Sequence, residues 1–211
     1  MDYFIILEDI LLTKLPKEKF IKFDKFYKLF LENKLIFDHN YRALDLENPS
    51  YNDFLSIVKP TKLPPIKNFK TKEGKKYLIH TILHIEYSAV DLALDAALRY
   101  QNMPLEFYKD WLEVASDEIR HFLMLEKLLN ELNGFYGELE VHKNLFEAMQ
   151  QTPDLLSRMA CIPRYLEANG LDQNPKIMEK LNSNKDEFNL KLIDALKIIL
   201  KEKSDILMYM F

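Results

Sequence analysis

The feature that most constrains this chain is a pair of acids on helical faces that should be apolar. Glu86 lies within one helical pattern of hydrophobic residues, Glu118 lies within a second, and His121 follows Glu118 by one turn. A carboxylate is costly to bury unless a counter-charge or a metal ion neutralises it. Glu-x-x-His is also the spacing with which four-helix bundles hold carboxylate-bridged metal pairs. The fold must therefore supply a partner for buried negative charge.

The composition favours an all-helical protein with a sizeable core. The chain has 211 residues and only 4 glycines, and it is rich in residues that favour helices. Its net charge is −4 with both signs interspersed, which gives no indication of nucleic-acid or membrane binding. The single Cys161 excludes an internal disulfide and fits a reducing cytoplasm. We expect neither a signal peptide nor a membrane span.

The sequence predicts three regions. Residues 1–57 form an N-terminal helical appendage, in which residues 16–37 make one or two amphipathic helices. Residues 58–72 form a linker rich in proline and lysine, which we expect to be extended and to lie over the main domain. Its lysines are interpreted as a solvated face rather than a nucleic-acid contact. Residues 73–211 form the main bundle.

The helical period from Lys72 onward predicts four bundle helices. We expect Gly134 to be the C′ residue after the second helix, and Thr152 to cap the start of the third. Pro163 should kink the third helix. The four predicted helices cover residues 73–100, 104–133, 152–169 and 185–203, with a turn over 135–141 and a short helix over 143–150 between the second and third.

Helical projection of residues 73–100 separates two sides. Glu86 lies on the apolar side, whereas His80 and His84 lie on the polar side in spite of their i,i+4 spacing. We expect ordinary hydrogen bonds from these histidines, in an outer polar network that includes Arg99, rather than metal binding. The polar side comprises His80, His84, Tyr87, Asp91 and Asp95, and the apolar side comprises Ile79, Ile82, Leu83, Ile85, Ala89, Val90, Ala93 and Ala97.

The second and third helices carry the remaining inward-facing groups. Glu118 lies near the middle of an apolar face and His121 at its edge, and Glu167 borders the next apolar face. Glu118 has two interpretations, as a metal ligand or as a buried acid paired with an arginine such as Arg158 or Arg164. Arg158 and Arg164 are also candidate partners of Glu167, in a structural role rather than on a substrate. The apolar face of the third helix comprises Leu155, Leu156, Met159, Ile162 and Leu166.

Several segments resemble, in order and over roughly residues 55–200, the ferritin-like family known as domain of unknown function number 455. The resemblance implies a ferritin-like four-helix bundle with metal ligands at Glu86, Glu118, His121 and Glu167. It also implies iron, with manganese as the alternative, and an oxidase or hydroxylase acting on an unknown small molecule. The segments are KPTKLPPIKNFKTKEGKKYLIHTILHIE (59–86), HIEYSAVDLALDAA (84–97), WLEVASDEIRHF (111–122), YGELEVHKNLFEA (136–148) and DLLSRMACIPRYLEANGLDQNP (154–175).

The last helix departs from that pattern. A complete di-iron bundle has a second Glu-x-x-His there, and the family resemblance implies it at positions where this chain has Lys203 and Ile206. Both positions are expected on the core face of the last helix, which is set by Phe188, Leu192, Leu196 and Ile199. Glu202 is one residue off and is expected to point elsewhere. We therefore predict a truncated last helix, one weakly bound metal ion or none, and little redox activity. A one-base deletion before this segment would explain the departure, because restoring one base can regenerate Glu-Ile-Gly-His.

Three functional interpretations stay open. The chain belongs to a di-iron oxidoreductase lineage, or it is a non-catalytic iron-binding protein, or it is an inactive bundle that serves as an interaction module. The N-terminal appendage disfavours a ferritin-type cage, so we expect a monomer or a dimer. Oxygen consumption on adding Fe(II) would support the first interpretation.

Overall fold

The computed structural model describes residues 1–65, 68–161, 168–184 and 186–210, and within those ranges the protein is all-helical with no β-sheet. The all-α class expected from composition is therefore confirmed. Two short 3₁₀ turns, Ser50–Asp53 and Pro60–Lys62, interrupt the long connection before the bundle. The helices are α1 (Tyr3–Leu12), α2 (Pro16–Leu31), α3 (Lys72–Arg99), α4 (Leu105–Glu131), α5 (Asn144–Gln151), α6 (Leu155–Cys161), α7 (Ala168–Asn182) and α8 (Glu187–Met210).

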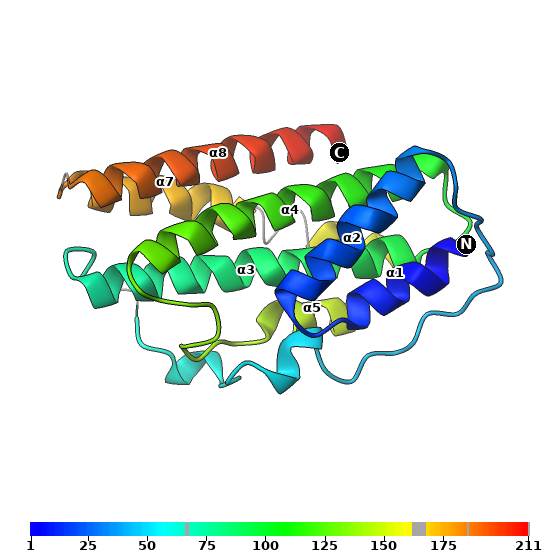
Figure 1. Cartoon of the computed structure of the whole chain (residues 1–211), viewed down its shortest axis with the longest axis horizontal. Helices are drawn as coiled ribbons and strands as arrows, with labels where there is room; N and C mark the ends of the chain where they lie inside the picture. The colour runs from blue at the N-terminus through cyan, green and yellow to red at the C-terminus, as the bar shows by residue number, and fades with distance from the viewer. Residues whose placement is uncertain (66–67, 162–167, 185, 211) are drawn as a thin grey trace.

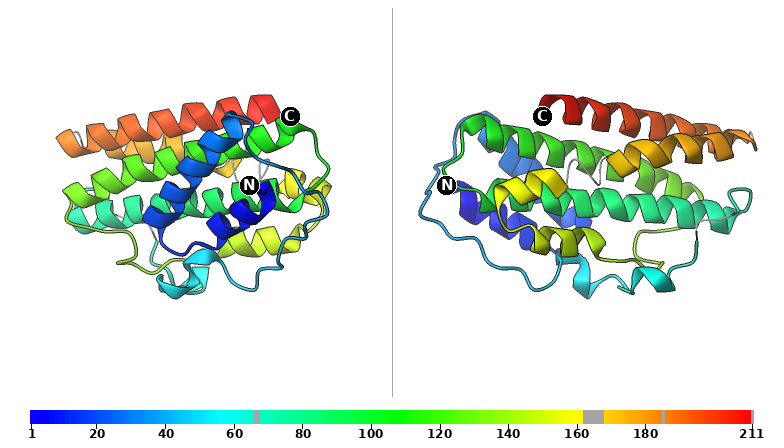
Figure 2. Two further views of the ribbon diagram at one scale, coloured as in Figure 1. Left: turned by 45° about the vertical axis from the view of Figure 1, so that its right-hand side comes forward. Right: turned by 180° about the vertical axis from the view of Figure 1, so that it is seen from behind.

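The long helices form a bundle built on an antiparallel pair. Figure 1 shows α3 and α4 running side by side in opposite directions, with α8 along the outer side of α4 and α7 beside α8. Helix α2 crosses the α3–α4 pair, and α5 packs against α3 on the other side from α8 (Figure 2). The two turns of helix that carry Glu86 and Glu118 therefore lie inside the bundle, facing α8.

Capping residues set the bounds of the central pair close to the prediction. The Thr71 side chain accepts a hydrogen bond from the Gly74 amide and so begins α3. After α4, the Gly134 amide donates to the Leu129 carbonyl at 3.0 Å. The residue in the left-handed conformation is Asn133, with φ of 54°, and not Gly134 as predicted. Asparagine tolerates that conformation, so the helix closes one residue earlier.

The predicted third helix is wrong in its bounds. Thr152 ends α5 by bonding to the Ala148 carbonyl, and the Asp154 side chain accepts from the Ser157 amide to begin α6. Helix α7 continues through Gly170 instead of ending there. These short polar side chains satisfy backbone groups at whichever helix end lies within reach, which a one-dimensional pattern does not show. Pro163, the predicted kink, lies outside the described residues.

Helix α3 is buried on both sides, which corrects the prediction of an outer polar side. The five residues of that polar side are buried, because α1, α2 and the loops before α3 and after α4 cover them. Conversely, Ile85 is 38% exposed and Leu156 is 81% exposed, although both were assigned to apolar faces. Arg158 takes the inward position on α6. A helical projection identifies the two sides of a helix but not which neighbours will cover them.

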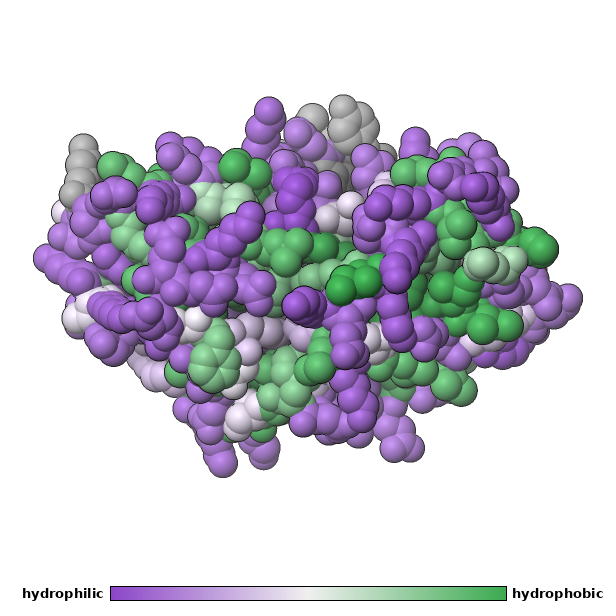
Figure 3. Space-filling model, viewed as in Figure 1, coloured by the Kyte–Doolittle hydropathy of each residue, from purple (hydrophilic) through white to green (hydrophobic). Residues whose placement is uncertain are grey.

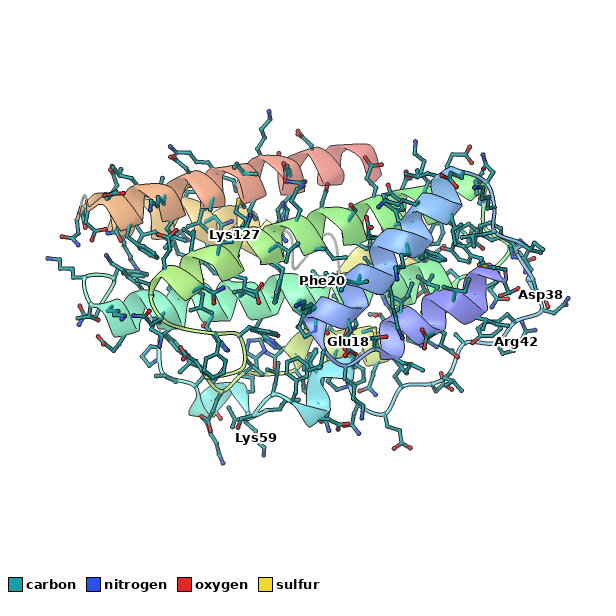
Figure 4. All side chains as sticks on the ribbon, viewed as in Figure 1. Glu18, Phe20, Asp38, Arg42, Lys59 and Lys127 are labelled. Atoms are coloured by element: carbon teal, nitrogen blue, oxygen red, sulfur yellow. The ribbon has the colours of Figure 1, made fainter. Side chains whose placement is uncertain are left out.

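The N-terminal helices share the core of the central pair. Phe20, which lies where α2 crosses the bundle in Figure 4, packs its ring 5.2 Å from that of Phe122 and 6.0 Å from that of Tyr87. The following segment is tied to the loop after α4, because the Val58 amide donates to the Val141 carbonyl at 2.8 Å. The N-terminal region thus packs against Tyr87 of α3, against α4 and against the loop that follows α4.

The surface mixes hydrophilic and hydrophobic residues. In Figure 3 hydrophobic side chains are scattered among hydrophilic ones on the face crossed by α2, and Ile5, Ile21 and Leu31 are among the exposed apolar residues. Among the described helices, none has the length and apolar character needed to cross a membrane.

Candidate metal centre

Two acids and an imidazole converge at one point inside the bundle. Glu86 comes from α3, and Glu118 and His121 come from consecutive turns of α4; their exposures are 2%, 1% and 0%. One ligand-type atom from each lies within 4.8 Å of the others. His121 Nδ1 is 3.3 Å from Glu118 Oε2 and 3.4 Å from Glu86 Oε2. The predicted convergence of these three residues is thus observed, whereas Glu167 lies outside the described residues.

Lys203 from α8 completes the cluster. Its Nζ is 2.9 Å from Glu118 Oε1 and 3.2 Å from Glu86 Oε2, and the side chain is buried. The prediction that this lysine lies on the core face is confirmed. An ammonium group therefore stands among the carboxylates, at the place where a metal ion would neutralise them. Glu118 is not paired with Arg158, and Arg164 lies outside the described residues.

The prediction that Glu202 points elsewhere is wrong. Its Oε2 is 2.6 Å from His121 Nε2, and Arg120 Nη1 binds both of its oxygens at 2.9 and 2.8 Å. Glu202 is about 100° around α8 from the core face, which places it at the edge where α8 meets α4. A carboxylate on the outer nitrogen of a histidine is the arrangement that orients metal-binding imidazoles. Glu202 holds the Nε2 side of the ring, so Nδ1 of His121 faces Glu86 and Glu118.

The neighbours of each group, and not only its burial, decide its charge. Burial raises the pKa of Glu86, but Lys203, Glu118 and His121 outweigh it and bring that pKa to about 2. Burial and the Glu86 charge raise the pKa of Glu118 against the attraction of Lys203. Burial lowers the pKa of His121, but Glu118 and Glu86 raise it to about 10. His121 is thus an imidazolium at neutral pH, and a metal ion binding to its Nδ1 would displace a proton.

The donor set fits one metal ion. Glu86 Oε2 is buried, and its contacts with Lys203 Nζ at 3.2 Å and His121 Nδ1 at 3.4 Å lack hydrogen-bond geometry. Two carboxylates and an imidazole are oxygen and nitrogen donors of the kind that hold divalent metal ions. Glu202 already holds the histidine by its outer nitrogen. The charge on Lys203 opposes a second cation in the same space, so the residues fit a metal ion that competes with the lysine.

His80 and His84 do not join this cluster, because they lie on the other side of α3 and bind the loop after α4. His84 Nε2 is 2.6 Å from the His142 carbonyl, which can only accept, so Nε2 carries the proton and Nδ1 accepts from Tyr136 at 2.8 Å. His80 Nε2 accepts from the Gly137 amide at 3.0 Å. The predicted hydrogen-bonding role of both histidines is confirmed.

The free energy of unfolding is expected to fall as the pH drops from about 6.5 to about 4. Burial lowers the pKa of His80 and of His84 to about 4, whereas unfolded histidines titrate near 6.5. The unfolded chain therefore takes up protons in this window that the folded chain refuses, and each histidine accounts for a loss of at most about 3 kcal/mol. Thermal unfolding between pH 7 and pH 4 measures this loss. His84→Gln should show a shallower pH dependence, and an unchanged slope would contradict the assignment.

Two further buried acids form ion pairs on this side of α3. Asp91 pairs with Lys19 from α2 and accepts from Ser50 at 2.6 Å. Asp95 accepts from Arg158 Nη1 and from Arg99 Nη2, each at 2.8 Å. These acids were expected in an outer network with His84 and Arg99. Arg99 does bind Asp95, but the network is buried, and its other partners are Lys19 and Arg158, which lie far away in sequence.

Together these features define an all-helical protein with a buried carboxylate–histidine–lysine cluster. The chain belongs to the family described as "Protein of unknown function (DUF455)", whose sequence model matches residues 12–205. A relative from Haemophilus influenzae, named "Uncharacterized protein", is 39% identical over 155 residues, which cover 70% of this chain and 52% of the relative. The chain thus spans about half the length of that relative. No solved structure matches the chain significantly.

Proposed function

We propose that this protein is a ferritin-like, carboxylate-type metal-binding protein whose site is weakened by a built-in lysine. The observation that carries the proposal is the convergence of Glu86, Glu118 and His121 around the ammonium group of Lys203. A buried pair of acids needs positive charge, and here either a metal ion or the lysine can supply it. A metal ion therefore binds in competition with Lys203, and it binds weakly.

The residues divide into ligands and a positioning residue. Glu86, Glu118 and Nδ1 of His121 would hold the ion, with Glu167 as a further ligand by family resemblance, and Glu202 orients the imidazole. Iron, or manganese in its place, would supply Lewis-acid and redox chemistry there, and the family resemblance favours an oxidase or hydroxylase lineage with an unknown small-molecule substrate. The charge of Lys203 next to Glu118 favours little redox activity in this chain. The lone Cys161 suits a cytoplasmic location.

A second candidate is a bundle that folds and acts without any metal ion. The same contacts favour it, because an ammonium group at 2.9 and 3.2 Å from the two acids already neutralises part of their charge. Such a protein would serve as a non-catalytic interaction module. The two candidates differ in whether a metal ion binds at all.

Metal loading separates them. After anaerobic incubation with Fe(II) or Mn(II), we expect at most one metal ion per chain, with an affinity low enough for dialysis to remove it. Glu118→Gln should weaken binding at least about tenfold, because it removes a charged ligand. Glu113→Gln, an exposed position on the same helix, is the matched control and should bind like the unmodified protein. Two tightly held ions per chain would refute the proposal, and no measurable binding would favour the metal-independent bundle.

A further inference from the structure

A separate cavity lies near the far end of α3. Its volume is about 230 Å³, and it is bounded by the loop at Asp45 and Leu46, the end of α3 and the α5–α6 connection. Arg99 in its wall is 13 positions after Glu86 (99 − 86), which is about 20 Å along the helix. The cavity is therefore distinct from the carboxylate–histidine cluster.

The wall of the cavity carries more positive than negative charge, with two arginines, of which Arg158 is buried and Arg99 is partly buried, against Asp45. Arg99 and Arg158 both line it, and both bind the same buried acid, Asp95. The other nitrogens of Arg158 are used, since Nη2 donates to the Met149 carbonyl at 3.0 Å and Nε to the Thr152 hydroxyl at 2.9 Å. Among the residues that the structure describes, Asp95 is thus the one buried carboxylate shared by both guanidinium groups, and Arg99 has Asp45 as its second acidic partner.

Asp45 supplies this second counter-charge only loosely. Its Oδ1 is 3.2 Å from Nη1 of Arg99, and its side chain is fully exposed. Ion pairs with an exposed partner contribute little, because water solvates the partner nearly as well. An incoming anion can therefore take the place of Asp45 on Arg99 at small cost.

The part of the cavity away from the arginines suits an apolar group of a ligand. Leu46, Met149 and Pro153 give it apolar wall area beside the arginines, and Gln150 is the other polar residue in the lining. A space of this volume is equivalent to about eight water molecules, so it suits a short chain rather than a nucleotide or a peptide. The planar fork of an arginine matches a carboxylate in geometry and charge.

We propose that this cavity binds a small organic carboxylate, whose charged group replaces Asp45 on Nη1 of Arg99 and whose apolar chain lies against Leu46, Met149 and Pro153. Asp45 is then an internal competitor that occupies the arginine when no ligand is present. The proposal does not depend on metal binding.

Calorimetric titration of the full chain with hexanoate tests the proposal. We expect saturable binding, and at least about tenfold weaker binding of hexanamide, which has the same shape without the charge. Asp45→Asn should tighten hexanoate binding about two- to fivefold, because it removes a weakly held competitor. Glu47→Gln, an exposed acid in the same loop, should leave the affinity unchanged. Arg99→Gln should weaken binding at least about tenfold. The buried ion pair between Asp95 and Arg158 is retained in that variant.

Three outcomes would overturn the proposal. They are the absence of saturable hexanoate binding in both the unmodified protein and Asp45→Asn, equal binding of hexanamide, or tighter binding of inorganic phosphate than of hexanoate. Glu118→Gln should retain the hexanoate affinity, so the test gives its answer whether or not the bundle binds a metal ion. The circular dichroism of each variant checks that it is folded.

Discussion

Lys203→Met is expected to make folding depend on a divalent metal ion. Without the ammonium group, Glu86 and Glu118 are two buried acids that share only His121 as a positive partner among the contacts observed here. Removing one partner of a buried ion pair lowers the free energy of unfolding by about 3–5 kcal/mol, because the other charge stays buried without compensation. In the presence of a chelator, Lys203→Met should therefore lower the melting temperature by more than a substitution at an exposed position does.

Manganese should restore much of that loss in the variant and little in the unmodified protein. An ion that binds only the folded state at 100 times its dissociation constant adds about 2.7 kcal/mol. Lys201→Met, an exposed position on the same helix, is the control and should respond to neither chelator nor manganese. If Lys203→Met does not accumulate, Lys203→Gln retains a hydrogen-bond donor and can be measured in its place. A variant that is destabilised but indifferent to manganese would refute the metal interpretation of the cluster.

Asp95→Asn is expected to be the other large effect, at about 3–5 kcal/mol. Asp95 is fully buried, and among the described residues it is the one carboxylate that pairs with Arg158, whose side chain is 1% exposed. The neutral amide keeps the shape of the side chain but leaves a buried guanidinium group without its counter-charge. Chemical denaturation of the variant and of the unmodified protein measures the difference.

Asp194→Asn is the matched control. Asp194 also forms an ion pair within one helix turn, with Lys197 at 3.0 Å, but both side chains are exposed. Exposed pairs contribute at most about 1 kcal/mol, so the control should lose far less than Asp95→Asn. The double variant Asp95→Asn with Arg158→Gln should recover part of the loss, because the two effects are coupled. Equal losses in the free energy of unfolding for Asp95→Asn and Asp194→Asn would show that the buried ion pair stabilises the fold no more than an exposed one.

Much of the central site could be predicted from local patterns. The helices that became α3 and α4 were expected at 73–100 and 104–133, because long runs with a clear helical period define one face. Glu86 and Glu118 interrupt those faces, and the same projection placed His121 beside them. Lys203 stands where the family resemblance implies the Glu of a second Glu-x-x-His, and its predicted position on the core face of α8 is confirmed.

Other parts of the site depended on contacts between distant segments. The hydrogen bond of Glu202 to His121 arises where the edges of α8 and α4 meet, and no periodicity in either helix encodes that edge. Lys19 and Arg158 resemble surface residues in sequence, yet each is buried against an acid on α3. The cavity at Arg99 has its walls in three separate segments.

The sequence by itself determined the helical class, the central helices and the inward direction of two acids, an imidazole and a lysine. These properties follow from the spacing of side chains along a single helix, which is local. Only the tertiary structure decided that both sides of α3 are covered, which cation meets which acid, and that Glu202 supports His121. Those outcomes depend on how separate helices pack, because the charge of a buried group is neutralised by whichever partner the packing brings within a few ångströms.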